Sequence, residues 1–306
     1  MENMKENAGL IPFHYKGETY HTWYKIVGDL HSGATPLVTL HGGPGVSHHY
    51  MLPHTDLVAL HKIPVIFYDQ IGIGASTHLR NKPAEFWTPE LWMDELENLL
   101  AYLGIQDAFD IVGNSWGGML GGQFAGVRRP PGLKHLVVAN AGASMELWQI
   151  GTKQLLERLE PEEVRETIKK HEREGTAGSE EWRKAMEVYN RKHICKVVPW
   201  PEELLMSFAS GDEDPTVYAT TIGPSEFNIV GTFKHWSIVD VVGNITVPTL
   251  LINARDDSAQ DIGLIPFFEK VARVKWIQFA HSSHTPLFEE RERYMEILGN
   301  FLTKTV

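Results

Sequence analysis

Residues 109–119 read FDIVGNSWGGM, with one serine, Ser115, among three glycines. The short apolar run before Gly113 predicts a buried strand, and the residues after Ser115 predict a helix. Gly-x-Ser-x-Gly at such a junction is typical of a sharp turn, because glycines let the chain bend and push the serine hydroxyl above the sheet edge. The segment therefore predicts a strand-turn-helix unit with Ser115 exposed at its turn.

Strand and helix signals alternate along much of the remaining chain. We expect a hairpin over 11–28 and buried strands over 36–40, 64–69, 109–113, 133–140, 247–253 and 274–280. Amphipathic helices are expected over 88–104, with Gly104 at the end, and over 115–129. Strands that alternate with helices are typical of a parallel sheet, so the predicted fold class is α/β.

The chain between residues 141 and 235 has a different character. It is rich in charged residues at helical spacing, is interrupted by Pro161, and carries no strand signal. We therefore predict a helical cap over 141–235. It would be inserted into an α/β core formed by residues 1–140 and 236–306.

The composition limits the expected partners. A formal net charge of −11 disfavours nucleic acid and anionic membranes, because both repel an acidic protein. The single cysteine, Cys195, and a start without the apolar core of a signal peptide favour the cytoplasm. No stretch approaches the roughly 18 apolar residues of a membrane helix. A small molecule or short peptide is the expected partner, and the oligomeric state is left open.

A second glycine-rich loop, HGGPG at residues 41–45, follows the strand expected over 36–40. Enzymes with a Gly-x-Ser-x-Gly turn hold an oxyanion with one N–H from such a loop and one from the residue after the serine. Gly43 and Trp116 are therefore the candidate donors. His41 is expected to be a buried hydrogen-bonding residue, since the base follows the acid in this type of chain.

An acid and a base are expected after Ser115, in the order serine, acid, histidine. Asp256 and Asp257 follow one late strand, and His281 and His284 follow the next. Adjacent side chains at a strand end point to opposite sides, so only one of the two acids can face the histidine. The His-x-x-His spacing also occurs in metal sites, but no third ligand lies nearby in motif spacing. We expect neither a metal nor an organic cofactor.

The order of these motifs resembles that of the proline iminopeptidase family of α/β-hydrolases, which are serine aminopeptidases with amino-acid amidases among their relatives. The matching stretches span nearly the whole chain and read HGGPG, YDQIGIGAS, GNSWGGM, GPSEFNIVGTFKHW, VPTLLINARDD and SSHTP. The resemblance implies an α/β-hydrolase fold, a mostly parallel sheet with an inserted helical cap. It also implies a catalytic triad of Ser115, Asp257 and His284.

The resemblance further implies a substrate-binding residue in the cap. The glutamate of the family's GPxEF motif, which binds the free ammonium group of the substrate, is Glu226 here. A second glutamate usually follows the triad aspartate, and Ser258 stands in its place. This departure weakens the expectation that the substrate must have a free amino terminus.

The sequence thus predicts a serine hydrolase that cleaves an amide or peptide bond of a small substrate through an acyl-enzyme. Glu226 favours a peptidase or amidase, whereas Ser258 favours an esterase or other acyl hydrolase acting on a neutral small molecule. A non-catalytic ligand-binding protein is a third alternative, which the intact triad order disfavours. We also expect at least one of the cap aromatics, four of which are named here, to line the pocket above Ser115. The four are Trp182, Trp200, Phe208 and Phe227.

Overall fold

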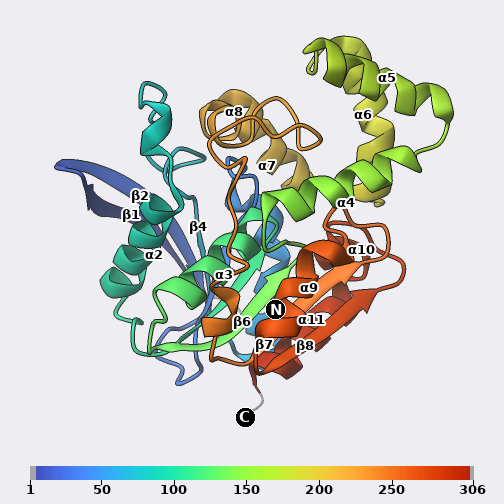
Figure 1. Ribbon diagram of the computed structural model, residues 1–306. Coiled ribbons are helices and arrows are strands. Elements are labelled where there is room, and N and C mark those ends of the chain that lie inside the picture. Colours follow the sequence, from blue (N-terminus) through green and yellow to red (C-terminus); the bar gives the residue numbers. More distant parts are fainter. Residues whose placement is uncertain (1–4, 304–306) are drawn as a thin grey trace.

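An eight-stranded sheet organises the protein in the computed structural model, which describes residues 5–303 (Figure 1). The strand order is β1-β2-β4-β3-β5-β6-β7-β8. β1 and β2 form a hairpin, β2 runs antiparallel to β4, and the remaining neighbours are parallel. The predicted α/β class with a mostly parallel sheet is confirmed. The strands are β1 (Glu6–Tyr15), β2 (Glu18–Val27), β3 (Leu37–Leu40), β4 (Val65–Tyr68), β5 (Phe109–Asn114), β6 (Leu133–Ala139), β7 (Thr249–Ala254) and β8 (Val274–Phe279).

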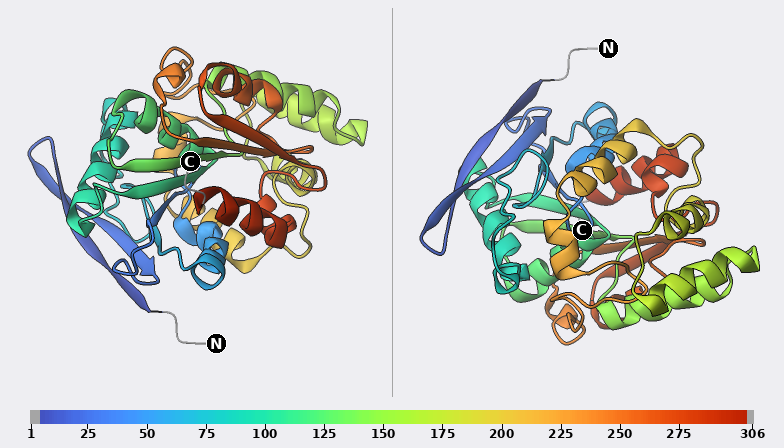
Figure 2. Two further views of the ribbon diagram at one scale, coloured as in Figure 1. Left: turned by 90° about the horizontal axis from the view of Figure 1, so that it is seen from below. Right: turned by 90° about the horizontal axis from the view of Figure 1, so that it is seen from above.

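Helices cover both faces of this sheet and give it two apolar cores (Figure 2). Helices α2, α3 and α9 contribute to one core, and α1 and α11 contribute to the other. These helices are α1 (Asp56–His61), α2 (Pro89–Leu103), α3 (Trp116–Val127), α9 (Asp261–Lys270), α10 (Pro286–Glu289) and α11 (Arg291–Leu302). Three short 3-10 helices lie at η1 (His48–Thr55), η2 (Ala84–Phe86) and η3 (Val242–Asn244).

Helix α2 shows how the local sequence sets an element. Pro89 occupies the first turn, where its missing N–H costs nothing, and Gly104 ends the helix in the left-handed region with φ 69°. Leu96 and Leu99 lie on the buried face. The helix and its end are therefore as the sequence predicts.

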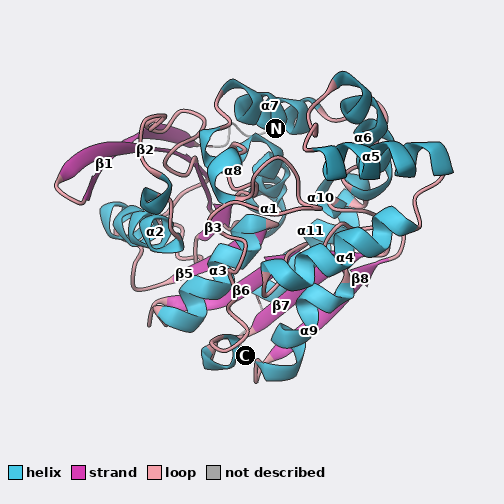
Figure 3. Ribbon diagram, turned by 45° about the horizontal axis from the view of Figure 1, so that its top comes forward, coloured by secondary structure: helices cyan, strands magenta, loops and turns pink. Residues whose placement is uncertain are grey.

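The segment from residue 141 to 235, which we call the cap segment, connects β6 to β7. It contains α4 (Met145–Glu157), α5 (Glu162–Glu174), α6 (Glu180–His193), α7 (Glu202–Glu213) and α8 (Thr216–Thr221). These helices lie above the carboxyl ends of the parallel strands (Figure 3). They carry a small apolar cluster of their own, which includes Leu155, Ile168 and Tyr189. No helix in the described part of the chain is long and apolar enough to cross a membrane.

Candidate active site

Ser115 lies at a strained turn between β5 and α3. Its backbone has φ 56° and ψ −126°, a region that costs a residue with a side chain about 1–3 kcal/mol. A Cβ atom at Gly117 would overlap the carbonyl oxygen of Leu40, and one at Gly113 would overlap the carbonyl of Gly117. The two glycines of the motif are therefore required by close approach of the backbone at this turn.

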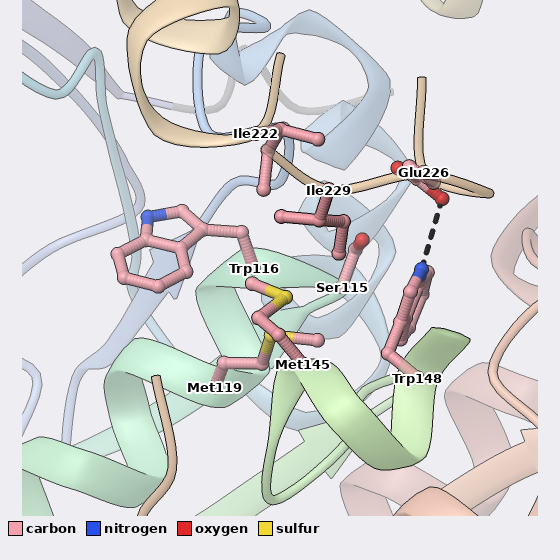
Figure 4. A pocket seen from close by; sticks show the side chains of 9 residues that line it. Ser115, Trp116, Met119, Met145, Trp148, Ile222, Glu226 and Ile229 are labelled. Atoms are coloured by element: carbon pink, nitrogen blue, oxygen red, sulfur yellow. Dashed lines mark hydrogen bonds between the residues drawn. The ribbon is translucent and has the colours of Figure 1, made fainter. Parts of the chain in front are cut away.

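The turn directs the Ser115 side chain into a small pocket (Figure 4). Most of the pocket wall is apolar and comes from Met119, Met145, Trp148, Ile222 and Ile229. Two of these residues belong to α4, and the two isoleucines come from the end of the cap segment. A single carboxylate, that of Glu226, completes the wall. The cavity thus combines an apolar surface with one acidic group near a serine hydroxyl.

His284 and Asp257 form a buried pair close to this pocket. The imidazole Nδ1 of His284 lies 2.7 Å from Oδ1 of Asp257, whose exposed fraction is 0%. Burial lowers the pKa of His284, but the carboxylates of Asp257, Glu226 and Glu289 together outweigh this effect, and the net pKa lies above the ordinary 6.5. Asp257 is therefore placed to orient His284 and to stabilise its protonated form.

The other acid and histidine candidates lie apart from this pair. Asp256 is ion-paired with Lys196, whose Nζ is 2.6 Å from Oδ2. His281 is exposed, and its backbone N–H donates to Glu290. Of the four residues that the sequence left as alternatives, the structure brings together Asp257 and His284.

The hydrogen bonds of the described chain do not include one between Ser115 and His284. Trp148 links the two residues in space, because it lines the pocket with Ser115 and its ring stands edge-on to His284, with 5.9 Å between ring centroids. Hydrogen bonds between catalytic groups are often long in ligand-free enzymes and shorten when substrate binds.

The two candidate oxyanion donors flank the serine. Gly43 and Trp116 both line the pocket, and neither backbone N–H has an acceptor among the hydrogen bonds of residues 5–303. His41 is buried, and its Nε2 accepts from the N–H of Gln70 at 2.9 Å. Burial lowers the pKa of His41 to about 4, so its imidazole is neutral. The prediction that His41 is a buried hydrogen-bonding residue is confirmed.

Glu226 and Ser258 have different surroundings. Trp148 donates its indole N–H to Oε2 of Glu226 at 3.1 Å (Figure 4). Burial raises the pKa of Glu226, with His284 opposing the shift. Ser258 is buried, and its Oγ lies 3.1 Å from Nδ1 of His284. Glu226 thus faces the pocket. Ser258 instead contacts Nδ1 of His284, which is the nitrogen that Asp257 also holds.

None of the four named cap aromatics lines the pocket within the part of the chain described, but another aromatic of the cap segment, Trp148, does. Phe227 lies in the apolar cluster of the cap segment because its neighbour Glu226 points the other way, into the pocket. Trp200 and Phe208 stack on each other, with ring centroids 5.6 Å apart. Trp182 donates to Glu172. Phe227 thus packs within the cap segment, whereas Trp200 packs against the core to which α1 and α11 contribute.

Sequence reasoning identified Gly43, Ser115, Trp116 and Glu226 of the pocket wall but missed its other residues, which are Met119, Met145, Trp148, Ile222 and Ile229. Met145 and Trp148 lie three positions apart on α4, so they share a helical face. The helix begins directly after Ser144, whose side chain caps it by accepting a hydrogen bond from the N–H of Leu147. The spacing and the cap were visible in the sequence, but the direction in which the face points was not. No group of three or more metal-binding side chains is present within residues 5–303.

The chain matches the family model described as the α/β-hydrolase fold over residues 35–291. The same class is indicated by the sheet, by the strained turn at the serine and by the buried histidine–aspartate pair. It is 32% identical to a proline iminopeptidase of Clostridium botulinum, over 98% of this chain and 99% of that protein. The solved proline iminopeptidase of Mycobacterium smegmatis superposes with a TM-score of 0.89, at 36% identity over 97% of both chains. The structure of VinJ gives a TM-score of 0.93, at 44% identity over 98% of this chain and 99% of that one. The chain belongs to the proline iminopeptidase family.

Proposed function

We propose that this hydrolase cleaves the amide or peptide bond that follows an amino-terminal residue with a free ammonium group. The observation that carries the proposal is the position of Glu226, a carboxylate in the apolar wall of the pocket that Ser115 enters. An ammonium group bound there would keep its charge paired, and the apolar side chain of the substrate would contact the methionines and isoleucines. Names of relatives at 32% and 36% identity support the same substrate class.

In the proposed mechanism, Ser115 Oγ attacks the carbonyl carbon while Nε2 of His284 takes the serine proton. The N–H groups of Gly43 and Trp116 stabilise the oxyanion that forms. His284 then gives its proton to the leaving amine, and a water molecule, activated by the same imidazole, hydrolyses the acyl-enzyme. Asp257 holds the imidazole throughout.

A substrate pair tests the role of Glu226. We measure kcat/KM for an aminoacyl anilide and for its N-acetyl counterpart, in the wild type and in Glu226→Gln. A charged hydrogen bond is worth about 1.5–3 kcal/mol, so Glu226→Gln should lower kcat/KM for the free-amine substrate by about ten- to a hundredfold. The N-acetyl substrate should be unaffected. Equal losses on both substrates would show that Glu226 supports the cap segment and not an ammonium group.

Ser115→Ala is the companion variant that tests the nucleophile. It should abolish turnover and covalent labelling by a fluorophosphonate, because loss of a triad member costs several orders of magnitude in rate. Retained labelling of Ser115→Ala would disprove the assignment.

The esterase alternative has one observation in its favour, since Ser258 supplies no second carboxylate. The aspartates that could replace this charge are engaged elsewhere. Asp256 pairs with Lys196, and Asp261 accepts from Asn253 and Gln278. A simple ester of an N-blocked amino acid, included in the same measurement, distinguishes this activity by a kcat/KM above that of the free-amine anilide.

A further inference from the structure

A continuous line of hydrogen bonds joins the glycine loop at residues 41–45 to the acid of the candidate triad. The N–H of Gly42 donates to Oη of Tyr50 at 2.8 Å, and this hydroxyl donates to Oδ1 of Asn114 at 2.9 Å. Nδ2 of Asn114 donates to Oδ1 of Asn140 at 3.1 Å. Nδ2 of Asn140 then donates to Oδ2 of Asp257 at 2.6 Å.

All the side chains of this line are buried. The exposed fractions are 4% for Tyr50, 1% for Asn114 and 0% for Asn140. Asn114 ends β5, and Asn140 follows directly after β6, so the line crosses the carboxyl edge of neighbouring strands. Buried amides and hydroxyls cost free energy unless they are paired, and a fully paired network is rigid. The line therefore has one well-defined arrangement.

Every donor in the line points toward Asp257. Side-chain amides do not pass protons along, so the line transfers no proton and acts by holding a charge. Oδ2 of Asp257 is held by Asn140, while Oδ1 faces His284 and also accepts from the N–H of Ala259 at 2.8 Å. The carboxylate can then meet the imidazole in only one orientation.

We propose that Asn140, supported by Asn114 and Tyr50, is a positioning residue that sets how strongly Asp257 attracts the proton of His284. The proposal rests on the proposed serine-hydrolase function. It also links the two halves of the site, since Tyr50 holds Gly42, the neighbour of the candidate oxyanion donor Gly43.

The cap segment is attached to the same line. Ser207 on α7 is buried, its Oγ accepts from the N–H of Tyr50 at 2.8 Å and donates to the carbonyl of Ser47 at 3.0 Å. The position of Tyr50 is therefore fixed from the core by Asn114 and from the cap segment by Ser207.

Other titratable groups surround the pair and are unchanged by substitutions in the line. Glu226 from the cap segment and Glu289 from α10 both raise the pKa of His284. Tyr189 and His193 of α6 are electrostatically coupled to Asp257. A change at Asn140 leaves these four groups in place, so a shift in the titration of His284 reports on the line.

Asn140→Gly removes the last donor while allowing the positive φ of 52° that this position has. Without this hydrogen bond the carboxylate of Asp257 is less stabilised and attracts the imidazolium proton more strongly. His284 should keep its proton to higher pH, and the acid limb of kcat/KM should move up by about half a pH unit or more. KM should change less than kcat.

Tyr50→Phe tests the distant end of the line and decides the matter if Asn140→Gly does not fold. It should lower kcat several-fold and move the acid limb in the same direction by a smaller amount. Thr249→Ala is the matched control, because Thr249 is equally buried at the other end of β7 and its hydroxyl donates to the carbonyl of Val247. It should lower stability without moving the acid limb.

The titration of His284 is also followed by NMR with ¹⁵N-histidine, using His284→Gln for assignment, so that this reading needs no turnover. A midpoint that rises in Asn140→Gly and Tyr50→Phe but not in Thr249→Ala supports the proposal. Identical midpoints and acid limbs in folded variants and wild type overturn it. A wild type that neither labels at Ser115 nor hydrolyses any substrate of the panel overturns the proposed function instead.

Discussion

Ser115 and Asn140 share an unusual backbone feature, since both have positive φ although neither is glycine. Asparagine tolerates this region comparatively well, whereas serine does so at a cost. Both residues follow the ends of neighbouring strands, so two adjacent strands turn sharply at the same edge of the sheet. The strain is concentrated where side chains must leave the sheet and enter the site.

The identity of the acid is testable with two neighbouring substitutions. Asp257→Asn should lower kcat by about 10⁴-fold, because it removes the partner that holds the correct tautomer of His284. Asp256→Asn serves as the control, and its loss should be small because Asp256 pairs with Lys196 at the surface. Steady-state kinetics on one aminoacyl anilide provide the measurement. A reversed ranking would assign the acid to Asp256.

The raised pKa of His284 predicts the pH dependence of the reaction. The imidazole must be neutral to accept the proton of Ser115, so activity is lost as the pH falls through the pKa of His284. Since Asp257, together with Glu226 and Glu289, holds this pKa above 6.5, the acid limb of kcat/KM should have its midpoint above pH 6.5. A pH profile of the wild-type enzyme measures this midpoint. A value below 6.5 would mean that burial outweighs these carboxylates.

Much of this residue-scale picture follows from the sequence, and the remainder depends on the order of the strands. Ser115 and the pair of Asp257 and His284 were nominated from spacing, chain order and resemblance. The line through Asn114 and Asn140 was not, because an asparagine after a strand is a common turn residue. Its role appears only when β5, β6 and β7 lie side by side.

At the scale of elements, the sequence predicts those whose period and end signals agree, as for α2 with Pro89 and Gly104. The sequence predicts poorly which side of a cap-segment helix faces the core. The reason is that apolar residues of one helix can line the pocket or pack within the cap segment, and the sequence does not distinguish them. Met145 and Trp148 line the pocket, while Leu155 on the same helix packs within the cap segment. One helix thus has an apolar surface divided between two neighbours.

The turn between α7 and α8 is attached to the core through Asp214. Its buried carboxylate accepts from Nδ1 of His78 at 2.5 Å, from Nε of Arg80 at 3.1 Å and from the hydroxyl of Thr216 at 2.6 Å. Burial raises the pKa of Asp214, but these hydrogen bonds outweigh it and lower the pKa to about 2. The ionised carboxylate therefore stabilises the fold above about pH 4, and this contribution is lost as the pH falls toward 2.

Asp214→Asn should lower the free energy of unfolding by about 1–3 kcal/mol, because it weakens hydrogen bonds to a buried charge. The effect should be largest between about pH 4 and 6.5, because the raised pKa of His78 adds stability that is lost as the pH rises through it. Denaturant unfolding at pH 5 and at pH 9 measures both values. Glu213→Gln, an exposed neighbour, should change neither.

At the scale of the whole molecule, the sheet separates two apolar cores. Leu96 of α2 belongs to one core and Leu298 of α11 to the other, and both are 0% exposed. Each Leu→Ala substitution should cost about 2–5 kcal/mol of unfolding free energy. Because the two residues lie in different cores, the double variant should lose the sum within about 0.5 kcal/mol, as measured by urea unfolding. If the loss in the double variant differs from the sum of the single losses by several times this margin, the two cores are energetically coupled through the sheet.

The position of the cap segment has a consequence for how such proteins diversify. The segment leaves the sheet after β6 and returns at β7, and these two strands are hydrogen-bonded neighbours in parallel register. Because the cost of closing a loop grows only slowly with its length, the sheet accommodates inserts of very different size between these two points. The segment that supplies much of the pocket wall is thus an insertion at a fixed point of the sheet. Evolution can therefore replace the cap segment, and with it the substrate specificity, while the strands that carry the candidate catalytic residues remain unchanged.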